Sequence, residues 1–212
     1  FLLMVFQSLA APLPAVLITI ANAKGGVAKT TSAMYLAAAF TRRYDGSAAI
    51  VLDADPQSSA SLWRDLAEDS GETLGMVDVR AANISTLQRL QGRPNGALTI
   101  VDAPPQGRLL EAAVEAADFV VVPISDSPLD LQQAWATMAA IPAGKPSAVL
   151  IVRAETKTRA YEATVEALDA QGTPRFDTVV RKRQDVKAAM GHRPAKLHEY
   201  AEVLGELLEA RA

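Results

Sequence analysis

Short apolar runs alternate along this chain with longer stretches whose apolar residues recur every three or four positions. The short runs consist mainly of Val, Ile, Leu and Ala, which is typical of strands buried on both faces of a parallel sheet. This pattern predicts strands at residues 16–20, 48–52, 75–81, 97–101, 119–123, 147–152 and 176–180.

The longer stretches have the spacing of a helix with one apolar face. They predict helices at residues 32–43, 58–69, 84–90, 109–117, 128–141, 158–170, 185–190 and 194–211. Because strands and helices alternate, we predict an α/β fold: a doubly wound, mostly parallel sheet with helices on both faces. No repeat or linker divides the chain, so residues 15–212 are expected to form a single domain.

The first residues need a separate interpretation, because no charged residue occurs before Lys24. Hydropathy alone would allow a membrane span or an export signal here. However, Pro12 and Pro14 interrupt the apolar run, and no basic residue precedes it. We therefore expect residues 1–14 to be an additional arm, packed or disordered, and we expect no membrane role.

Composition narrows the possible chemistry. The 212 residues are 50% hydrophobic and include no cysteine and only two histidines. Disulfides, thiolate catalysis and cysteine-ligated zinc are excluded, and a histidine-based metal site is disfavoured. The net charge of −3 gives no overall sign of nucleic-acid binding, so such a role would require a local basic patch.

A phosphate-binding loop is predicted within ITIANAKGGVAKTT, residues 18–31. A strand, a Gly-Gly turn, a lysine and a helix follow one another, so backbone N–H groups and the helix N-terminus would face an anion. Lys29 would reach the β- and γ-phosphates, and the Thr30 hydroxyl would bind Mg²⁺.

Carboxylates follow two of the other predicted strands. Asp53 and Asp55 follow the strand at 48–52, and Asp102 follows the strand at 97–101. The carboxyl ends of parallel strands meet at one edge of a sheet, beside a phosphate loop. An aspartate after an apolar strand has the Walker B arrangement, which orients Mg²⁺ and its waters.

These motifs resemble the ParA/MinD superfamily of ATPases, which are P-loop NTPases with a deviant Walker A loop. The loop carries the extra lysine Lys24, and alanines stand at positions 23 and 28 in place of the glycines of an ordinary Walker A motif. DADPQ at 53–57 looks like switch I, and DAPP at 102–105 looks like Walker B and switch II. VVPISDSPLDLQQA at 121–134 is similar to small ParA proteins that lack an N-terminal DNA-binding domain.

The resemblance covers the chain from about Ala15 to its end and implies ATP or ADP with Mg²⁺ as ligands. The methyl group of Ala28, where most members have glycine, would be tolerated at negative φ. The implied nucleotide-binding residues are Lys24, Gly25, Gly26, Val27, Ala28, Lys29, Thr30, Thr31 and, near the base, Pro123.

The resemblance also implies individual roles at the reacting phosphate. Lys24 would cross a dimer interface to the partner's nucleotide, and with Lys29 would stabilise the transferring phosphoryl group. Asp55 would orient or activate the attacking water, although an aspartate before Pro56 is also a favourable helix N-cap. Thr30, Asp53 and Asp102 would hold the metal and its waters.

The partners follow from the same resemblance. It implies an ATP-dependent homodimer that binds DNA non-specifically, with a ParB-like protein stimulating hydrolysis, in a cytoplasmic, nucleoid-associated role in plasmid or chromosome partition. The alternatives are positioning of a microcompartment or chemotaxis cluster, MinD-like membrane cycling, and a nucleotide-dependent scaffold without hydrolysis. Electron transfer, as in the iron-protein relatives, is excluded because no cysteine can bind a cluster.

The C-terminal third is locally basic and carries the predicted DNA contacts. Its cations between 175 and 196 outnumber the two aspartates there, and Arg181, Lys182, Arg183 and Lys187 are the predicted phosphate-backbone contacts. A solvated helix face is the alternative. The last helix combines an apolar stripe with an acidic face, whereas a membrane-targeting helix would need a basic face, so we expect it to pack on the sheet.

Overall fold

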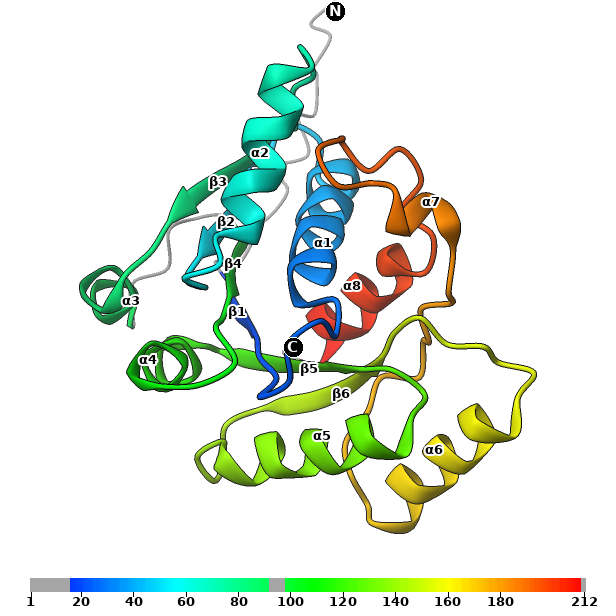
Figure 1. The fold of residues 1–212 in the computed structure, drawn as a ribbon. Coiled ribbons are helices and arrows are strands. Elements are labelled where there is room, and N and C mark those ends of the chain that lie inside the picture. The colour runs from blue at the N-terminus through cyan, green and yellow to red at the C-terminus, as the bar shows by residue number, and fades with distance from the viewer. Residues whose placement is uncertain (1–15, 92–97, 211–212) are drawn as a thin grey trace, which may run out of the picture.

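The computed structural model describes residues 16–91 and 98–210. In this part of the chain six strands form one parallel sheet in the order β3-β2-β4-β1-β5-β6 (Figure 1). The strands are β1 (Val16–Ile20), β2 (Ala49–Asp53), β3 (Val77–Ala81), β4 (Leu98–Asp102), β5 (Phe119–Ile124) and β6 (Ser147–Ile151).

Helices cover both faces of the sheet (Figure 1). Side chains of α1, α2 and α8 share one apolar core, and side chains of α3, α4, α5 and α6 share the other. The helices are α1 (Lys29–Arg43), α2 (Ser59–Asp69), α3 (Ile84–Leu90), α4 (Arg108–Ala116), α5 (Pro128–Ala140), α6 (Arg159–Ala170), α7 (Gln184–Lys187) and α8 (Tyr200–Glu209).

The central strand β1 explains why the apolar runs are continuous. Ile18 and Ile20 enter the core beneath α1, whereas Leu17 and Ala21 enter the opposite core. Successive side chains of a strand point to opposite faces, so a strand covered on both sides must be apolar throughout. Thr19 is fully buried, and its hydroxyl donates to the carbonyl of Ala113 over 2.7 Å.

The predicted fold class is confirmed, and most element boundaries lie within a few residues of the prediction. Two small differences matter for the site. Strands β2 and β4 each extend one residue further than expected, to Asp53 and Asp102, and these two residues are direct register partners. The predicted arm over residues 1–14 lies outside the described residues.

The predicted strand at 176–180 is wrong. This segment runs beside β6 with isolated bridges at Arg175 and, past the end of β6, at Arg181. The N–H groups of Phe176 and Val180 make single hydrogen bonds to Val149 and Ile151. Between these bridges, the N–H groups of Asp177 and Thr178 each donate over 2.8 Å to the carboxylate of Glu206 on α8. Because these donors are committed to a side chain, they do not continue a strand ladder.

The last two predicted helices are shorter than expected. The carbonyls of Pro194 and Ala195 accept hydrogen bonds from the Arg42 guanidinium, and His198 has a φ of 49°, so α8 begins only at Tyr200. The apolar stripe of α8 is buried and packs against α1 in the core on that face of the sheet. Within the described residues, no helix is both long enough and apolar enough to cross a membrane.

Candidate nucleotide-binding site

The loop between β1 and α1 lies at the carboxyl end of the central strand, which pairs with β4 on one side and β5 on the other. Lys29 is the first residue of α1 and is buried. Its ammonium donates to the carbonyls of Asn22 at 3.5 Å and Lys24 at 3.2 Å. Burial lowers the pKa of Lys29, and the nearby carboxylates of Asp102 and Asp55 only partly oppose this shift.

Asn22 fastens the loop to the neighbouring strand. Its amide donates to the carbonyl of Pro123 over 2.8 Å, and its side-chain oxygen accepts the N–H of Lys24 over 2.8 Å. Pro123 is buried within β5 and is not among the described residues that line the cavity beside the loop. The structure therefore shows Pro123 in contact with the loop, through the side chain of Asn22.

Ala28 ends the loop in the left-handed region, with φ 61° and ψ 32°. A methyl group was expected to be tolerated here at negative φ, and the observed φ is positive, which is the less favourable case. Such a conformation costs an L-residue about 1–2 kcal/mol, whereas glycine adopts it freely. Gly26, with a φ of 75°, supplies a second left-handed position in the same loop.

Two buried aspartates lie beneath the start of α1. Asp102 accepts the Thr30 hydroxyl over 2.6 Å, and Asp53 accepts the N–H and hydroxyl of Ser61 over 2.7 and 2.6 Å. The other oxygen of each carboxylate is buried and has no hydrogen-bond partner among the described residues. Burial raises the pKa of Asp102 to about 7, and neighbouring Asp53 adds to the rise.

This arrangement fits a divalent cation. Mg²⁺ prefers oxygen ligands and retains several waters, so unpartnered carboxylate oxygens beside a hydroxyl suit its hydration shell. Within the described part of the chain, no group of three or more His, Asp or Glu side chains converges as a metal cage. The residues present therefore fit an ion held by the Thr30 hydroxyl, phosphate and water, with Asp102 and Asp53 binding the waters.

Asp55 lies in the turn after β2, where its carboxylate accepts the N–H of Gln57 over 2.9 Å. Helix α2 begins at Ser59, with Ser58 in the N-cap position, so the interpretation of Asp55 as the helix N-cap is wrong. Asp55 lines the cavity beside the loop together with Lys29 and Thr30. It is thus placed to contact a bound ligand or its waters.

The cavity has a volume of about 630 Å³. The phosphate loop and the start of α1 form one wall, Asp55 and Gln57 contribute to another, and Arg153 with residues of the 180–187 segment lines a third. A nucleotide-sized ligand is accommodated by a cavity of this size. The predicted loop residues Gly25, Gly26, Ala28, Lys29, Thr30 and Thr31 all line it, whereas Val27 is buried.

Lys24 differs from the rest of the loop because it does not line this cavity. Its ammonium forms an ion pair with Asp130 in the first turn of α5. The Asp130 side chain is 4% exposed and also accepts the N–H and hydroxyl of Ser125, over 3.1 and 2.6 Å. Burial alone would raise the pKa of Asp130, but the hydrogen bonds from Lys24 and Ser125 outweigh it and hold the pKa below its usual value.

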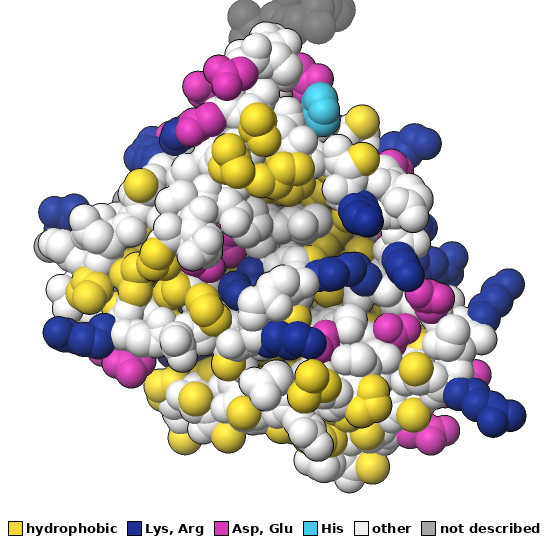
Figure 2. Space-filling model, in the orientation of Figure 1, with side chains coloured by type: hydrophobic (Ala, Val, Ile, Leu, Met, Phe, Trp, Pro, Cys, Tyr) yellow, Lys and Arg dark blue, Asp and Glu magenta, His cyan; other side chains and the backbone are white. Residues whose placement is uncertain are grey.

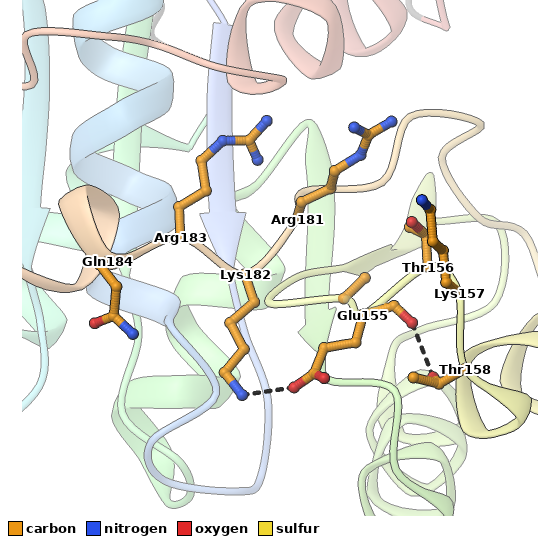
Figure 3. Close-up of a pocket in the computed structure, with 9 residues that line it drawn as sticks. Glu155, Thr156, Lys157, Thr158, Arg181, Lys182, Arg183 and Gln184 are labelled. Carbon is orange, nitrogen blue, oxygen red and sulfur yellow. Dashed lines mark hydrogen bonds and ion pairs between the residues drawn. The ribbon is translucent and has the colours of Figure 1, made fainter.

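The basic residues predicted to contact DNA adjoin the same cavity. Arg181, Lys182 and Arg183 line both it and a neighbouring groove beside residues 154–158 (Figure 3). Lys187 also lines the cavity. Lys182 pairs with Glu155 over 2.5 Å, and Arg183 pairs with Glu199 over 2.6 Å. Figure 2 shows Lys and Arg side chains gathered over the middle of this face, with acidic side chains among them.

Comparison with known proteins agrees with this geometry. Residues 18–195 match the family described as the CobQ/CobB/MinD/ParA nucleotide-binding domain. This chain belongs to that family. The family assignment covers the phosphate loop, both strand-end acidic motifs and the 180–187 segment.

Two relatives carry names that concern carboxysomes. Maintenance of carboxysome distribution protein A of Gloeobacter kilaueensis is 36% identical over 170 residues, which cover 77% of this chain and 76% of that protein. The protein of the same name from Halothiobacillus neapolitanus is 30% identical over 181 residues, covering 78% of this chain and 79% of its own length.

A solved structure supports the fold independently. A putative plasmid partition protein from Borrelia burgdorferi, bound to AMPPNP, superposes with a TM-score of 0.69. The alignment covers 92% of this chain and 97% of that chain, with 19% sequence identity. At this identity the likeness establishes the shared fold only.

Two side chains that contact the loop, those of Asp130 and Arg153, have no local signal in the sequence. Asp130 stands in the first turn of a helix, and Arg153 lies in no motif. An acidic residue in the first turn of a helix is a common and uninformative feature. Both contacts join parts of the chain more than 100 residues apart, because Asp130 reaches Lys24 and Arg153 donates to the carbonyl of Gly26.

The raised pKa of Asp102 predicts a pH-dependent stability without bound metal. The folded protein binds this proton more tightly, with a pKa of about 7 against the usual 3.8. The folded state therefore holds more protons within this window, and the free energy of unfolding falls as the pH rises through it. Asp102→Asn should remove this loss and make the protein more stable than wild type above pH 7, by at most about 4 kcal/mol.

Urea denaturation of both proteins between pH 4 and pH 8 in EDTA measures the difference. Groups that do not interact with Asp102 contribute equally to the two curves and cancel. Parallel curves would contradict a burial-driven shift at Asp102. Adding Mg²⁺ with nucleotide should restore wild-type stability at high pH, because a cation beside the carboxylate favours its charged form.

Proposed function

We propose that this chain is a Mg²⁺-dependent ATPase whose ATP-bound form is a dimer with composite active sites. One observation carries this proposal: Lys24 belongs to the phosphate loop, yet its ammonium lies on Asp130 and outside the cavity of its own subunit. A loop lysine turned away from its own cavity would reach a second subunit by exchanging its ion pair with Asp130 for the partner's phosphates. The added positive charge would stabilise the phosphoryl group in transfer, as an arginine finger does.

The rest of the site supports nucleotide hydrolysis within each subunit. Lys29 and the N-terminus of α1 would bind the phosphates, since the first N–H groups of a helix have no intrahelical acceptor. Magnesium, when bound, neutralises phosphate charge. Asp55 lines the cavity beside Lys29 and Thr30, where its carboxylate would orient the attacking water.

The work driven by hydrolysis is proposed to be the positioning of a large cargo. The names of the two carboxysome-distribution relatives favour a protein microcompartment as that cargo. The name of the plasmid partition protein with the same fold favours a plasmid or chromosome. In both cases an adaptor protein on the cargo, of the ParB type for DNA, would stimulate hydrolysis. Action in the cytoplasm, on the nucleoid, is part of the same proposal.

We propose that the ATPase binds non-specific DNA while it positions its cargo. The DNA contacts would come from Arg181, Lys182, Arg183 and Lys187. Arg181 and Lys182 support this because their side chains are 63% and 58% exposed. Their ion pairs with Glu199 and Glu155 would have to be exchanged for phosphate contacts. Since the segment also lines the nucleotide cavity, bound nucleotide would influence how these side chains are presented.

The two loop lysines should have separable roles. Lys24→Ala should lower ATP turnover at least about 100-fold, because it removes charge stabilisation of the transition state, while the affinity for ATP stays nearly unchanged. Lys29→Ala should abolish nucleotide binding itself. Phosphate release measures turnover, and equilibrium titration with a fluorescent ATP analogue measures affinity.

Turnover by Lys24→Ala equal to that of wild type would contradict the composite site. Wild-type protein that binds ATP but releases no phosphate, with or without DNA and adaptor, would instead indicate a nucleotide-dependent scaffold. Arg80→Ala, which removes an exposed ion pair with Asp78 on the edge strand β3, is the matched control and should behave as wild type.

The combined substitution of Arg181, Lys182 and Arg183 by alanine should abolish salt-sensitive DNA binding. Each phosphate contact contributes about one unit to the slope of log affinity against log salt, so these three residues together should account for roughly two to three units of the wild-type slope. The assay is DNA retention at saturating ATP, and ATP affinity is measured separately because these residues line the nucleotide cavity. DNA retention that persists at wild-type strength would contradict the assignment of these residues as DNA contacts.

A further inference from the structure

Arg153 stands at the edge of the nucleotide cavity in an uncommon backbone conformation. It lies two residues after the end of β6 and has a φ of 55°, in the left-handed region that long side chains rarely adopt. The backbone is fixed on both sides, because the N–H of Val152 donates to Ile124 over 2.7 Å and the N–H of Ala154 donates to Val180 over 3.0 Å. Strained positions held this firmly cluster at functional sites.

This backbone conformation places the Arg153 side chain beside the phosphate loop. The guanidinium donates to the carbonyl of Gly26, and Arg153 lines the cavity together with Lys29 and Thr30. A guanidinium has five N–H groups, so one contact leaves most of its donors available. Arg153 is also exposed, so these donors face solvent in the cavity.

The charge of Arg153 is not matched by a carboxylate. Among the described residues, the neighbouring Arg181, Lys182 and Arg183 all have glutamate partners, whereas Arg153 appears in no ion pair. In this respect Arg153 resembles Lys29, whose ammonium is also bonded only to carbonyls of the loop. Two cations without ion-pair partners therefore flank the same Gly-rich turn.

We propose that Arg153 is a phosphate ligand supplied by the same subunit that holds the nucleotide. On nucleotide binding its guanidinium would exchange the Gly26 carbonyl for phosphate oxygens, which it can bind with two parallel hydrogen bonds. This inference rests on the proposed nucleotide-binding function and deepens it. Because Arg153 acts within one subunit, its contribution should already be present in monomeric protein with ADP, unlike that of Lys24.

The experiment is titration of monomeric protein with a fluorescent ADP analogue. Arg153→Ala and Arg153→Gly should each weaken binding about 10- to 100-fold, the loss expected for charge-assisted hydrogen bonds. Arg153→Lys should fall between these variants and wild type, because it keeps the charge without the planar fork. Arg159→Ala, an exposed arginine outside the cavity lining, should bind as wild type does.

Arg153→Gly separates binding from folding. Glycine accepts a positive φ without strain, so this variant should melt no lower than Arg153→Ala while binding ADP equally weakly. Wild-type affinity in both variants would overturn the proposal and leave the proposed ATPase standing. Failure of the wild-type protein to bind either ADP or ATP would instead refute the proposed function itself.

Discussion

The phosphate loop depends on side chains that satisfy its carbonyl oxygens. Lys29 binds the carbonyls of Asn22 and Lys24, and Arg153 binds that of Gly26. Asn22 and Lys29 are buried, and a backbone carbonyl without a partner is costly where water is excluded, so Lys29 holds the turn in shape before any ligand arrives. The amide of Asn22 then fixes the turn to β5. A loop organised in this way loses little conformational freedom when a phosphate binds, which favours affinity.

Negative charge is concentrated beside the loop, at the carboxyl ends of β2 and β4. Register pairing of β2 with β4 places Asp53 beside Asp102, both buried and each with one unpartnered oxygen. Burial of charged carboxylates without compensation is unfavourable, as the raised pKa of Asp102 shows. A divalent cation would relieve this cost. Without its ligands the site thus holds uncompensated negative charge. This charge lowers the stability of the folded protein and favours the binding of a cation.

Local sequence patterns were sufficient for the architecture but not for every element or contact. The strands up to β6 and the phosphate loop follow from apolar runs and a Gly-Gly turn, which are local signals. The segment at 176–180 looked like a strand, yet Glu206 on α8 binds its N–H groups. The partnership of Lys24 with Asp130, and the position of Arg153, depend on how distant segments meet. The basic cluster was found from sequence, but its position on the wall of the nucleotide cavity required the fold.

The central claim is that Lys24 acts across a dimer interface, and subunit mixing tests it most directly. Lys24→Ala and Asp55→Asn protein should each be inactive alone. In a mixed dimer, the site with intact Asp55 would receive Lys24 from the Asp55→Asn subunit, so mixing should restore ATP turnover in half of the sites of that dimer. If Lys24 acts within its own subunit, no site in the mixture is complete. Turnover that stays at background at every mixing ratio, with mixed dimers demonstrably formed, would contradict the account.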